Sequence, residues 1–193
     1  MPRIQAPSLS EHRDWRRSQL IEAAAAIALE SGGDFITVAA VASRAGLSRT
    51  AVYEYFASSA DLVADLIIDE LETFALIMEK STRSASDPLA AIQGWITSSL
   101  TYIADGRHLL AKALNAVDLP RERSAAIGAA HRALLAPLHS AIAEIGITDI
   151  AQALSLLQSA TDCATKRIEA GSDAEVEISI TIKFCTAGLL AII

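Results

Sequence analysis

The sequence predicts an all-α protein with about nine helices. Apolar residues make up 52% of the 193 residues, but aromatic residues only 5%, and alanine is abundant. Alanine is the strongest helix former and gains little in a pleated sheet, so this composition favours helices over strands. Ser, Thr and Asp also recur in front of apolar runs with helical spacing, where they can cap a helix. The segment 176–182 alternates like a strand, but a capping pattern before it and apolar residues after it favour a helix.

Composition also restricts the environment in which the chain is expected to work. Its length allows one or two domains with a sizeable core, and its apolar content excludes a disordered chain. Cys163 and Cys185 are the only cysteines, so a disulfide framework is excluded, and both are expected to be buried. The longest apolar run, 178–193, contains Lys183 and is too short to span a membrane, and residues 1–19 are too polar for a signal peptide. We therefore expect a cytoplasmic protein without membrane contact.

The first part of the chain is expected to contain three helices that Gly and Ser residues separate. Residues 1–9 include two prolines and are expected to form a loose arm. Apolar residues repeat at helical spacing over 10–30, and Ser31-Gly32-Gly33 ends this helix because glycine readily adopts positive φ. Thr37 and Ser48 are the expected N-caps of two shorter helices over residues 38–45 and 48–56.

Six further helices are expected from the caps and breakers in the rest of the chain. Ser58 with Asp61 forms a capping box, and Asp87 precedes a proline at the first helical position. Pro137 is expected to bend its helix, which Gly146 then ends. These helices are predicted over residues 58–81, 87–104, 106–116, 120–145, 149–171 and 172–193.

The segment Thr37–Phe56 is typical of a helix-turn-helix motif. Its two capped helices join through a tight turn, in which Gly46 can adopt the left-handed conformation. Leu47 and Val52 can seal the helix pair on the inside. The second helix of such a motif enters the major groove of DNA, where arginine can pair with guanine and hydroxyls can bind bases or phosphates. Its exposed side carries suitable side chains, namely Ser48, Arg49, Thr50 and Tyr53.

This region resembles the N-terminal domain of the tetracycline-repressor (TetR) family of transcription regulators. The resemblance covers about residues 16–66 and implies a helix-turn-helix DNA-binding domain with its arm over residues 1–58. It also implies an all-helical domain over residues 59–193 that binds a small-molecule effector and forms a homodimer. That second domain has no motif of its own, so its assignment follows from the N-terminal match. The match rests on Glu30-Ser31-Gly32-Gly33, Phe35-Ile36-Thr37-Val38, residues 41–48, residues 52–56 and Asp61-Leu62-Val63.

The resemblance implies roles for individual residues in binding double-stranded operator DNA. Positions that contact phosphate in the family are occupied here by Thr37, Ser48 and Tyr53. Residues 49–51 occupy positions that face base edges. The full set of expected DNA-binding residues is Thr37, Arg44, Ser48, Arg49, Thr50, Tyr53 and Tyr55.

One position departs from the family pattern. The family usually has a phosphate-contacting lysine at the start of the fourth helix, where this chain has Ser59. Serine removes a cation from the expected interface. Arginines elsewhere in the N-terminal region are expected to compensate, namely Arg13, Arg16, Arg17 and Arg44.

An effector site is expected among the few large or polar side chains on the apolar faces of the C-terminal helices. Aromatic walls with a few polar anchors are typical of small-molecule sites, although core packing alone explains each of these residues equally well. Such a largely apolar site favours an apolar or amphipathic effector. The candidates are Phe74, Met78, Trp95, Tyr102, His108, Asn115, His131 and Cys163.

A homodimer is expected because a two-fold dimer places two recognition helices on successive major grooves. The last predicted helix is apolar nearly all round, as a buried helix is. Residues 151–164 include small side chains that permit close approach, so the two helices can form a four-helix bundle between subunits. The expected interface residues are Leu154, Leu157, Ile180, Phe184, Ala187 and Leu190.

The predicted function is a ligand-responsive repressor that binds a palindromic operator and leaves it when an effector binds. Two alternatives stay open, a DNA-binding or protein-interaction factor without an effector, and an all-helical enzyme with an appended helix-turn-helix. No catalytic or metal-ligand spacing supports enzymatic activity or a cofactor. The formal net charge of −7 does not oppose DNA binding, because residues 1–60 are neutral, with six basic and six acidic residues. The acidic excess lies in residues 61–193, with ten basic and seventeen acidic residues.

Overall fold

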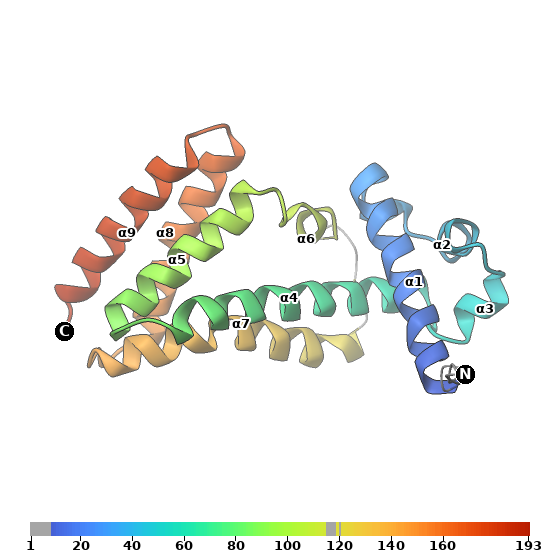
Figure 1. Ribbon diagram of the computed structural model, residues 1–193, viewed down its shortest axis with the longest axis horizontal. Coiled ribbons are helices and arrows are strands. Elements are labelled where there is room, and N and C mark those ends of the chain that lie inside the picture. The colour runs from blue at the N-terminus through green and yellow to red at the C-terminus, as the bar shows by residue number, and fades with distance from the viewer. Residues whose placement is uncertain (1–8, 115–118, 120) are drawn as a thin grey trace, which may run out of the picture. The chain divides into compact units, whose positions relative to one another are not determined.

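The computed structural model describes residues 9–114, 119 and 121–193, with side chains from residue 12 onward. This part of the chain confirms the all-α prediction, with nine α-helices, two short 3-10 helices and no strand (Figure 1). None of these helices is long and apolar enough to cross a membrane. The elements are α1 (Leu9–Ser31), η1 (Gly33–Phe35), α2 (Val38–Ala45), α3 (Arg49–Tyr53), α4 (Ser59–Arg83), α5 (Pro88–Ala104), α6 (Leu109–Leu114), η2 (Arg121–Arg123), α7 (Ser124–Glu144), α8 (Ile150–Glu169) and α9 (Ala174–Leu190).

Side-chain caps begin five of the helices where the sequence predicts them. Thr37, Ser48, Asp87 and Asp149 each accept a hydrogen bond from the backbone N–H three residues further on, at 2.8–3.1 Å. Ser58 does the same before α4, at 3.0 Å. Each bond satisfies a backbone donor that the first turn of a helix leaves without an intrahelical partner. Short polar side chains therefore set where these helices begin.

Some helix boundaries differ from the prediction. α3 ends at Tyr53, because the N–H groups of residues 55 and 56 both bond the Val52 carbonyl and close a turn there. α6 begins at Leu109, later than the predicted start at residue 106. α9 begins after Asp173 rather than Ser172, because the aspartate carboxylate makes the capping bond. α7 continues past Pro137, and the helix start expected at Pro120 lies outside the described residues.

The two cysteines lie in different environments. Cys185 is buried in α9, and burial raises the pKa of its thiol to about 11. Cys163 is exposed on α8. The expectation that both are buried is therefore wrong for Cys163, because its position on α8 turns the side chain away from the helices that α8 packs against.

The first of two compact units comprises residues 1–69 and 109–127. In this unit α1 packs against α2, η1 and α6. Val41, Val52 and Phe56 are at most 1% exposed, and α6 adds Leu110 and Leu114 to the same core. The helix-turn-helix is thus fixed on a core to which a distant segment of the chain contributes.

The second unit comprises residues 70–108 and 128–193. Its helices α5, α8 and α9 pack against one another, and Met78 of α4 and Leu138 of α7 lie in the same core. The buried indole Nε1 of Trp95 donates to the Leu134 carbonyl at 3.3 Å, so this polar atom is satisfied. The two units are defined by contacts, and the functional division after residue 58 stays a prediction.

Candidate nucleic-acid interface

The turn between α2 and α3 fixes the geometry of the motif. Gly46 adopts φ 67°, a left-handed conformation that a residue with a Cβ reaches only with strain. The Leu47 N–H then bonds the Ala42 carbonyl at 2.9 Å, and Ser48 caps α3 directly afterwards. The expected left-handed turn is therefore present.

α3 has a buried side and an exposed side. Val52 is fully buried, and Phe56 just beyond the helix is 1% exposed. On the other side Arg49 and Thr50 are exposed, and Tyr53 is 58% exposed. Exposure of a large aromatic ring to solvent is unfavourable, because its apolar area stays in contact with water. Such exposed rings are common on surfaces that bind a partner. Of the other expected DNA-binding residues, Thr37, Arg44 and Ser48 are exposed and Tyr55 is half-buried.

Arg44 is already engaged within the unit. Its guanidinium donates two hydrogen bonds to the carboxylate of Glu30, at 2.5 and 2.6 Å. These bonds, more than the charge alone, lower the pKa of Glu30 and raise that of Arg44. The pair ties the end of α1 to α2, so a phosphate contact by Arg44 would compete with Glu30.

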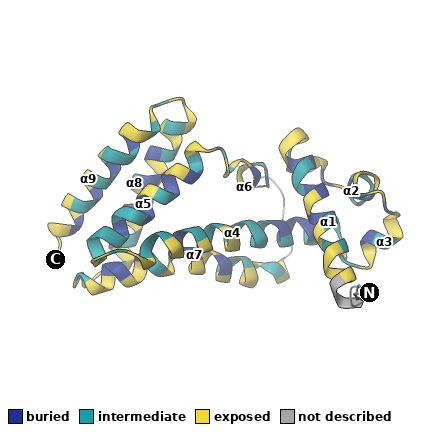
Figure 2. Cartoon of the chain, viewed as in Figure 1, coloured by how far each residue is buried: buried dark blue, intermediate teal, exposed yellow. Residues whose placement is uncertain are grey.

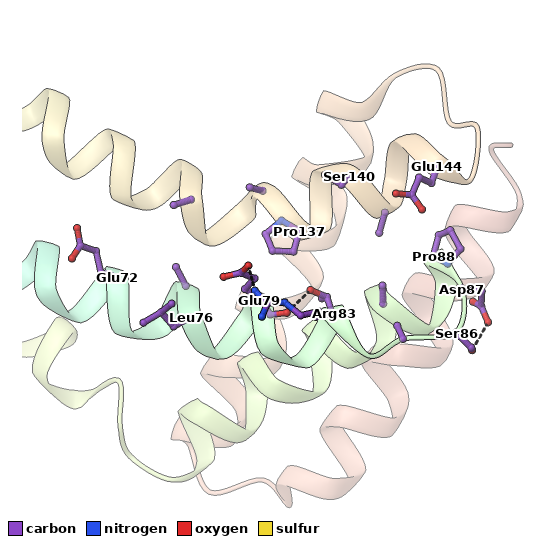
Figure 3. A pocket seen from close by; sticks show the side chains of 17 residues that line it. Glu72, Leu76, Glu79, Arg83, Ser86, Asp87, Pro88, Pro137, Ser140 and Glu144 are labelled. Atoms are coloured by element: carbon purple, nitrogen blue, oxygen red, sulfur yellow. Dashed lines mark hydrogen bonds and ion pairs between the residues drawn. The ribbon is translucent and has the colours of Figure 1, made fainter.

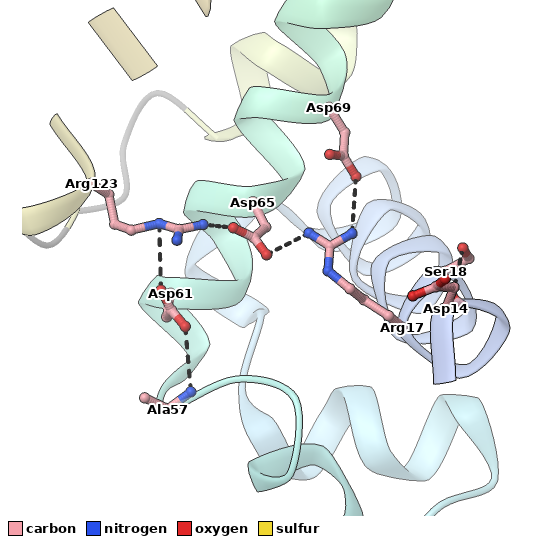
Figure 4. Close-up of polar contacts among 8 residues, drawn as sticks. All are labelled: Asp14, Arg17, Ser18, Ala57, Asp61, Asp65, Asp69 and Arg123. Carbon is pink, nitrogen blue, oxygen red and sulfur yellow. Dashed lines mark hydrogen bonds and ion pairs between the residues drawn. The ribbon is translucent and has the colours of Figure 1, made fainter. Parts of the chain in front are cut away.

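Arg17 is also engaged, in a cluster centred on Asp65 (Figure 4). Its guanidinium contacts Asp65 at 2.5 Å and Asp69 at 3.9 Å and lies over the Phe56 ring. Arg123 of η2 pairs with the other oxygen of Asp65 and with Asp61 at 3.5 Å. The Asp65 carboxylate thus links α1, α4 and η2. A phosphate contact by Arg17 would compete with this ion pair.

Arg13 and Arg16 have no ion pair among the described residues. Together with His12, Glu54 and Tyr55 they line a shallow depression of about 340 Å³. The guanidinium carbon of Arg13 lies 5.9 Å from the centre of the Tyr55 ring. Four arginines are expected to compensate for Ser59. Arg13 and Arg16 are the two whose positive charge is not neutralised by an ion pair among the described residues.

The expected effector residues do not form one cavity. Met78 and Trp95 are buried in the core of the second unit, whereas His131 and Cys163 are exposed. Asn115 lies outside the described residues. A ligand role for these side chains stays a prediction.

Three of the expected effector residues, Phe74, Tyr102 and His108, make ring or polar contacts within the second unit. The Phe74 and Tyr102 rings stack at 4.3 Å, and the Tyr102 hydroxyl donates to Glu70 at 3.4 Å. Burial, together with the Glu70 charge, raises the pKa of Tyr102. His108 Nε2 lies 2.8 Å from a Glu169 oxygen, while its buried Nδ1 has no hydrogen-bond partner among the described residues.

Most of the expected interface residues lie on the open side of α9. Much of α9 is coloured as exposed or intermediate (Figure 2). Ile180, Phe184 and Leu190 are 52–69% exposed, and Ala187 is exposed as well. Leu154 is half-buried. Leu157 is only 2% exposed and packs inside the unit, so it supports the interface helices from within.

Several features had no signal in the local sequence. The partners Arg17 and Asp65 are 48 residues apart, and neither lies in a recognisable motif. The exposed rings of Trp15 and Phe35, at 58% and 63%, also follow no pattern that separates them from core aromatics. Only the three-dimensional arrangement reveals which charges are paired and which rings are open.

The sequence of the N-terminal region and the fold of the chain are both similar to those of known proteins. Residues 20–66 match the family model of bacterial regulatory proteins, tetR family. No curated protein matches the chain significantly. The fold is similar to that of FadR from Bacillus subtilis, solved in complex with stearoyl-CoA, with a TM-score of 0.73 and 21% identity over 89% of this chain and 98% of that chain.

Two further solved structures share the fold at low sequence identity. FadR from Bacillus halodurans, described as a fatty acid degradation regulator, has a TM-score of 0.73 and 18% identity over 90% of this chain and 96% of that chain. The TetR-family transcriptional regulator PfmR from Thermus thermophilus has a TM-score of 0.68 and 20% identity over 87% and 97% of the two chains. These likenesses extend the shared fold beyond the matched N-terminal segment.

Substitution Asp65→Asn is expected to destabilise the protein by about 1–3 kcal/mol, because it leaves two guanidiniums without their shared, largely buried carboxylate. Chemical denaturation measures this loss. The matched control is Glu79→Gln, which breaks the exposed pair with Arg83 and is expected to cost less than about 0.5 kcal/mol. Equal losses in the two variants would contradict a structural role for the Asp65 cluster.

Proposed function

We propose that this chain, whose residues 20–66 match the model of bacterial regulatory proteins of the tetR family, is a transcriptional regulator that represses its targets by binding a palindromic operator as a homodimer. Binding of a small-molecule effector favours a conformation in which the recognition helices no longer match the operator. Such release requires the effector to bind the two conformations with different affinity. The observation that carries this proposal is the outer side of α3, which presents Arg49, Thr50 and Tyr53 on a helix whose other side is anchored in a core.

The direct DNA contacts are proposed for α3. Arg49 has no ion pair among the described residues, so its fork of N–H donors is available to guanine O6 and N7 or to phosphate. Tyr53 places a ring and a hydroxyl one helical turn further on, on the same side. Thr37 and Ser48 lie at the beginnings of the two helices and add hydroxyls close to the same surface.

The contact that Ser59 cannot make is proposed for Arg13 and Arg16. Both lie near the beginning of α1, beside Tyr55, which follows α3 in the sequence. Their charges are opposed in the depression only by Glu54, which forms no ion pair with either among the described residues. A DNA phosphate would supply the anion that each guanidinium lacks.

The homodimer is proposed to form through α8 and α9. Phe184 and Ile180 are a turn apart on α9 and are more than half exposed, although large apolar side chains normally leave water. Exposed apolar patches of this kind mark interaction surfaces. A second copy covers them symmetrically, since a two-fold interface uses the same surface on both subunits.

An effector is proposed because this fold can hold a ligand, as the Bacillus subtilis FadR structure does with stearoyl-CoA. The alternative is a DNA-binding or protein-interaction factor without an effector. A groove between α4 and α7 in the second unit favours the effector.

Gel-shift titration with the DNA that flanks the protein's own gene tests operator binding and its side chains. Arg49→Ala is expected to weaken specific binding by about 1–3 kcal/mol, and Tyr53→Phe by less, because only the hydroxyl is lost. Arg132→Ala on α7 removes the same charge from the second unit and is the control. Absence of specific binding by a folded dimer would refute the operator proposal, and unchanged affinity in both α3 variants would refute these contacts.

The double substitution Arg13→Ala with Arg16→Ala tests the phosphate contacts separately. Each lost phosphate contact is expected to reduce the slope of log K against log salt by about 0.9, whatever the DNA sequence. The slope for the double variant is therefore expected to fall by about one to two, with similar effects on specific and nonspecific DNA. A slope equal to that of the unsubstituted protein would show that these arginines do not reach the DNA.

Phe184→Asp tests the proposed dimer interface. A carboxylate in the centre of an apolar interface loses its hydration without gaining a partner, so the variant is expected to be monomeric. Light scattering coupled to size-exclusion chromatography measures the mass. Leu29→Asp, at a leucine 58% exposed on α1, is the matched control and is expected to stay dimeric; a dimeric Phe184→Asp variant would place the interface elsewhere.

A further inference from the structure

A groove of about 920 Å³ lies between α4 and α7 and is closed at one end by the segment that leads into α5. Figure 3 shows it with Glu72 and Leu76 toward one end and Asp87, Pro88 and Glu144 toward the other. Its volume falls within the range of small-molecule sites in proteins. None of the effector residues expected from the sequence lines it.

The floor of the groove is apolar and is built from small side chains. Leu76 and Pro137 face one another across it, and the remaining floor consists mainly of alanines. Small side chains leave space that larger ones would fill. A ligand lying here would therefore contact a smooth apolar surface along most of its length. The alanines are Ala75, Ala85, Ala91, Ala133, Ala136 and Ala141.

The rim of the groove is acidic. It carries four carboxylates and one guanidinium, and that guanidinium, from Arg83, pairs with Glu79. The Asp87 carboxylate caps α5, and its hydrogen bonds to the Ala90 N–H and the Ser86 hydroxyl lower its pKa, so it stays ionised. Glu72 and Glu144 have no ion-pair partner among the described residues. Two carboxylates at opposite ends are thus available to a ligand.

We propose that this groove binds an amphipathic organic cation, whose apolar body lies on the alanine floor and whose ammonium group pairs with Glu72 or Glu144. Charge complementarity decides the class, because the rim carries a formal charge of −3 and would repel a carboxylate or phosphate ligand. This proposal names the chemical class of the effector and therefore rests on the regulatory role proposed above. It differs from the acyl-CoA of the Bacillus subtilis FadR complex, whose phosphates are anionic.

Isothermal titration of the full-length protein with two probes of equal chain length tests the charge selection. Octyltrimethylammonium and octanoate, both used below their micelle concentrations, share an apolar chain but carry opposite charges. The cation is expected to bind with one site per chain, at least about tenfold more tightly than octanoate, and more weakly as salt is added. Equal or tighter binding of octanoate, or no binding of either probe, would refute the proposal.

Two kinds of variant locate the site. Glu72→Gln with Glu144→Gln keeps the shape of the groove and is expected to weaken cation binding about tenfold, as the loss of charge-assisted contacts would. Ala136→Leu fills the floor from an exposed position and is expected to abolish binding while circular dichroism stays unchanged. Glu122→Gln, at an exposed glutamate outside the groove, is the control for the loss of a single surface carboxylate.

Unchanged cation binding in both groove variants would place the probe elsewhere and refute the site. A change in oligomeric state in those variants without probe binding would instead identify the groove as a contact between copies, which also refutes it. The titration contains no DNA, so a failure of operator binding leaves its result intact. Release of operator by octyltrimethylammonium in the gel shift then connects the two proposals.

Discussion

The first unit depends on how its carboxylates pair with a small number of arginines. Asp65 is the decisive one, because its two oxygens hold Arg17 of α1 and Arg123 of η2, and its side chain is only 17% exposed. Asp65 is largely buried while both arginines are partly exposed, so the carboxylate is the member of the cluster that most needs its partners. The three segments can therefore move apart only by exposing all of these charges together. This carboxylate thus helps to hold α1 against the first turns of α4, beside the apolar core under α3.

The same pairing is compatible with the DNA contacts proposed above, although the N-terminal region has no net charge. Arg17 and Arg44 are neutralised within the unit by carboxylates, whereas Arg13, Arg16 and Arg49 have no ion pair among the described residues. The net charge of the N-terminal region does not show which arginines are paired. The paired arginines stabilise the unit, and the unpaired ones are available to a ligand. The attraction to DNA depends on local surplus charge and not on the total. A chain with an acidic C-terminal region can keep a surface that attracts phosphate.

Local features were predictable because local physics produces them. Local interactions alone produce the helix caps at Thr37, Ser48 and Asp87 and the left-handed turn at Gly46. Each depends on residues within a few positions, so it can be predicted from a short stretch of sequence. The exposed side of α3 followed from helical spacing and from the resemblance to the family. The groove in the second unit could not be predicted in this way, because Glu72, Ala136 and Glu144 come from two helices far apart in sequence. Large residues such as Met78 and Trp95 were predicted to contact an effector, but they are buried in the core. The groove forms where the side chains are small.

The first unit is discontinuous in sequence, and this limits how the chain can be divided. Residues 70–108 belong to the second unit and separate residues 1–69 from the segment 109–127 that completes the first. A fragment that ends at residue 69 would contain the whole helix-turn-helix yet lack Leu110, Leu114 and Arg123, so its core would face water and Asp65 would keep only one partner. The helix-turn-helix is consequently not expected to fold stably when it is separated from residues 109–127. Exchanging it between regulators to build new specificities would require transferring the α6–η2 segment with it.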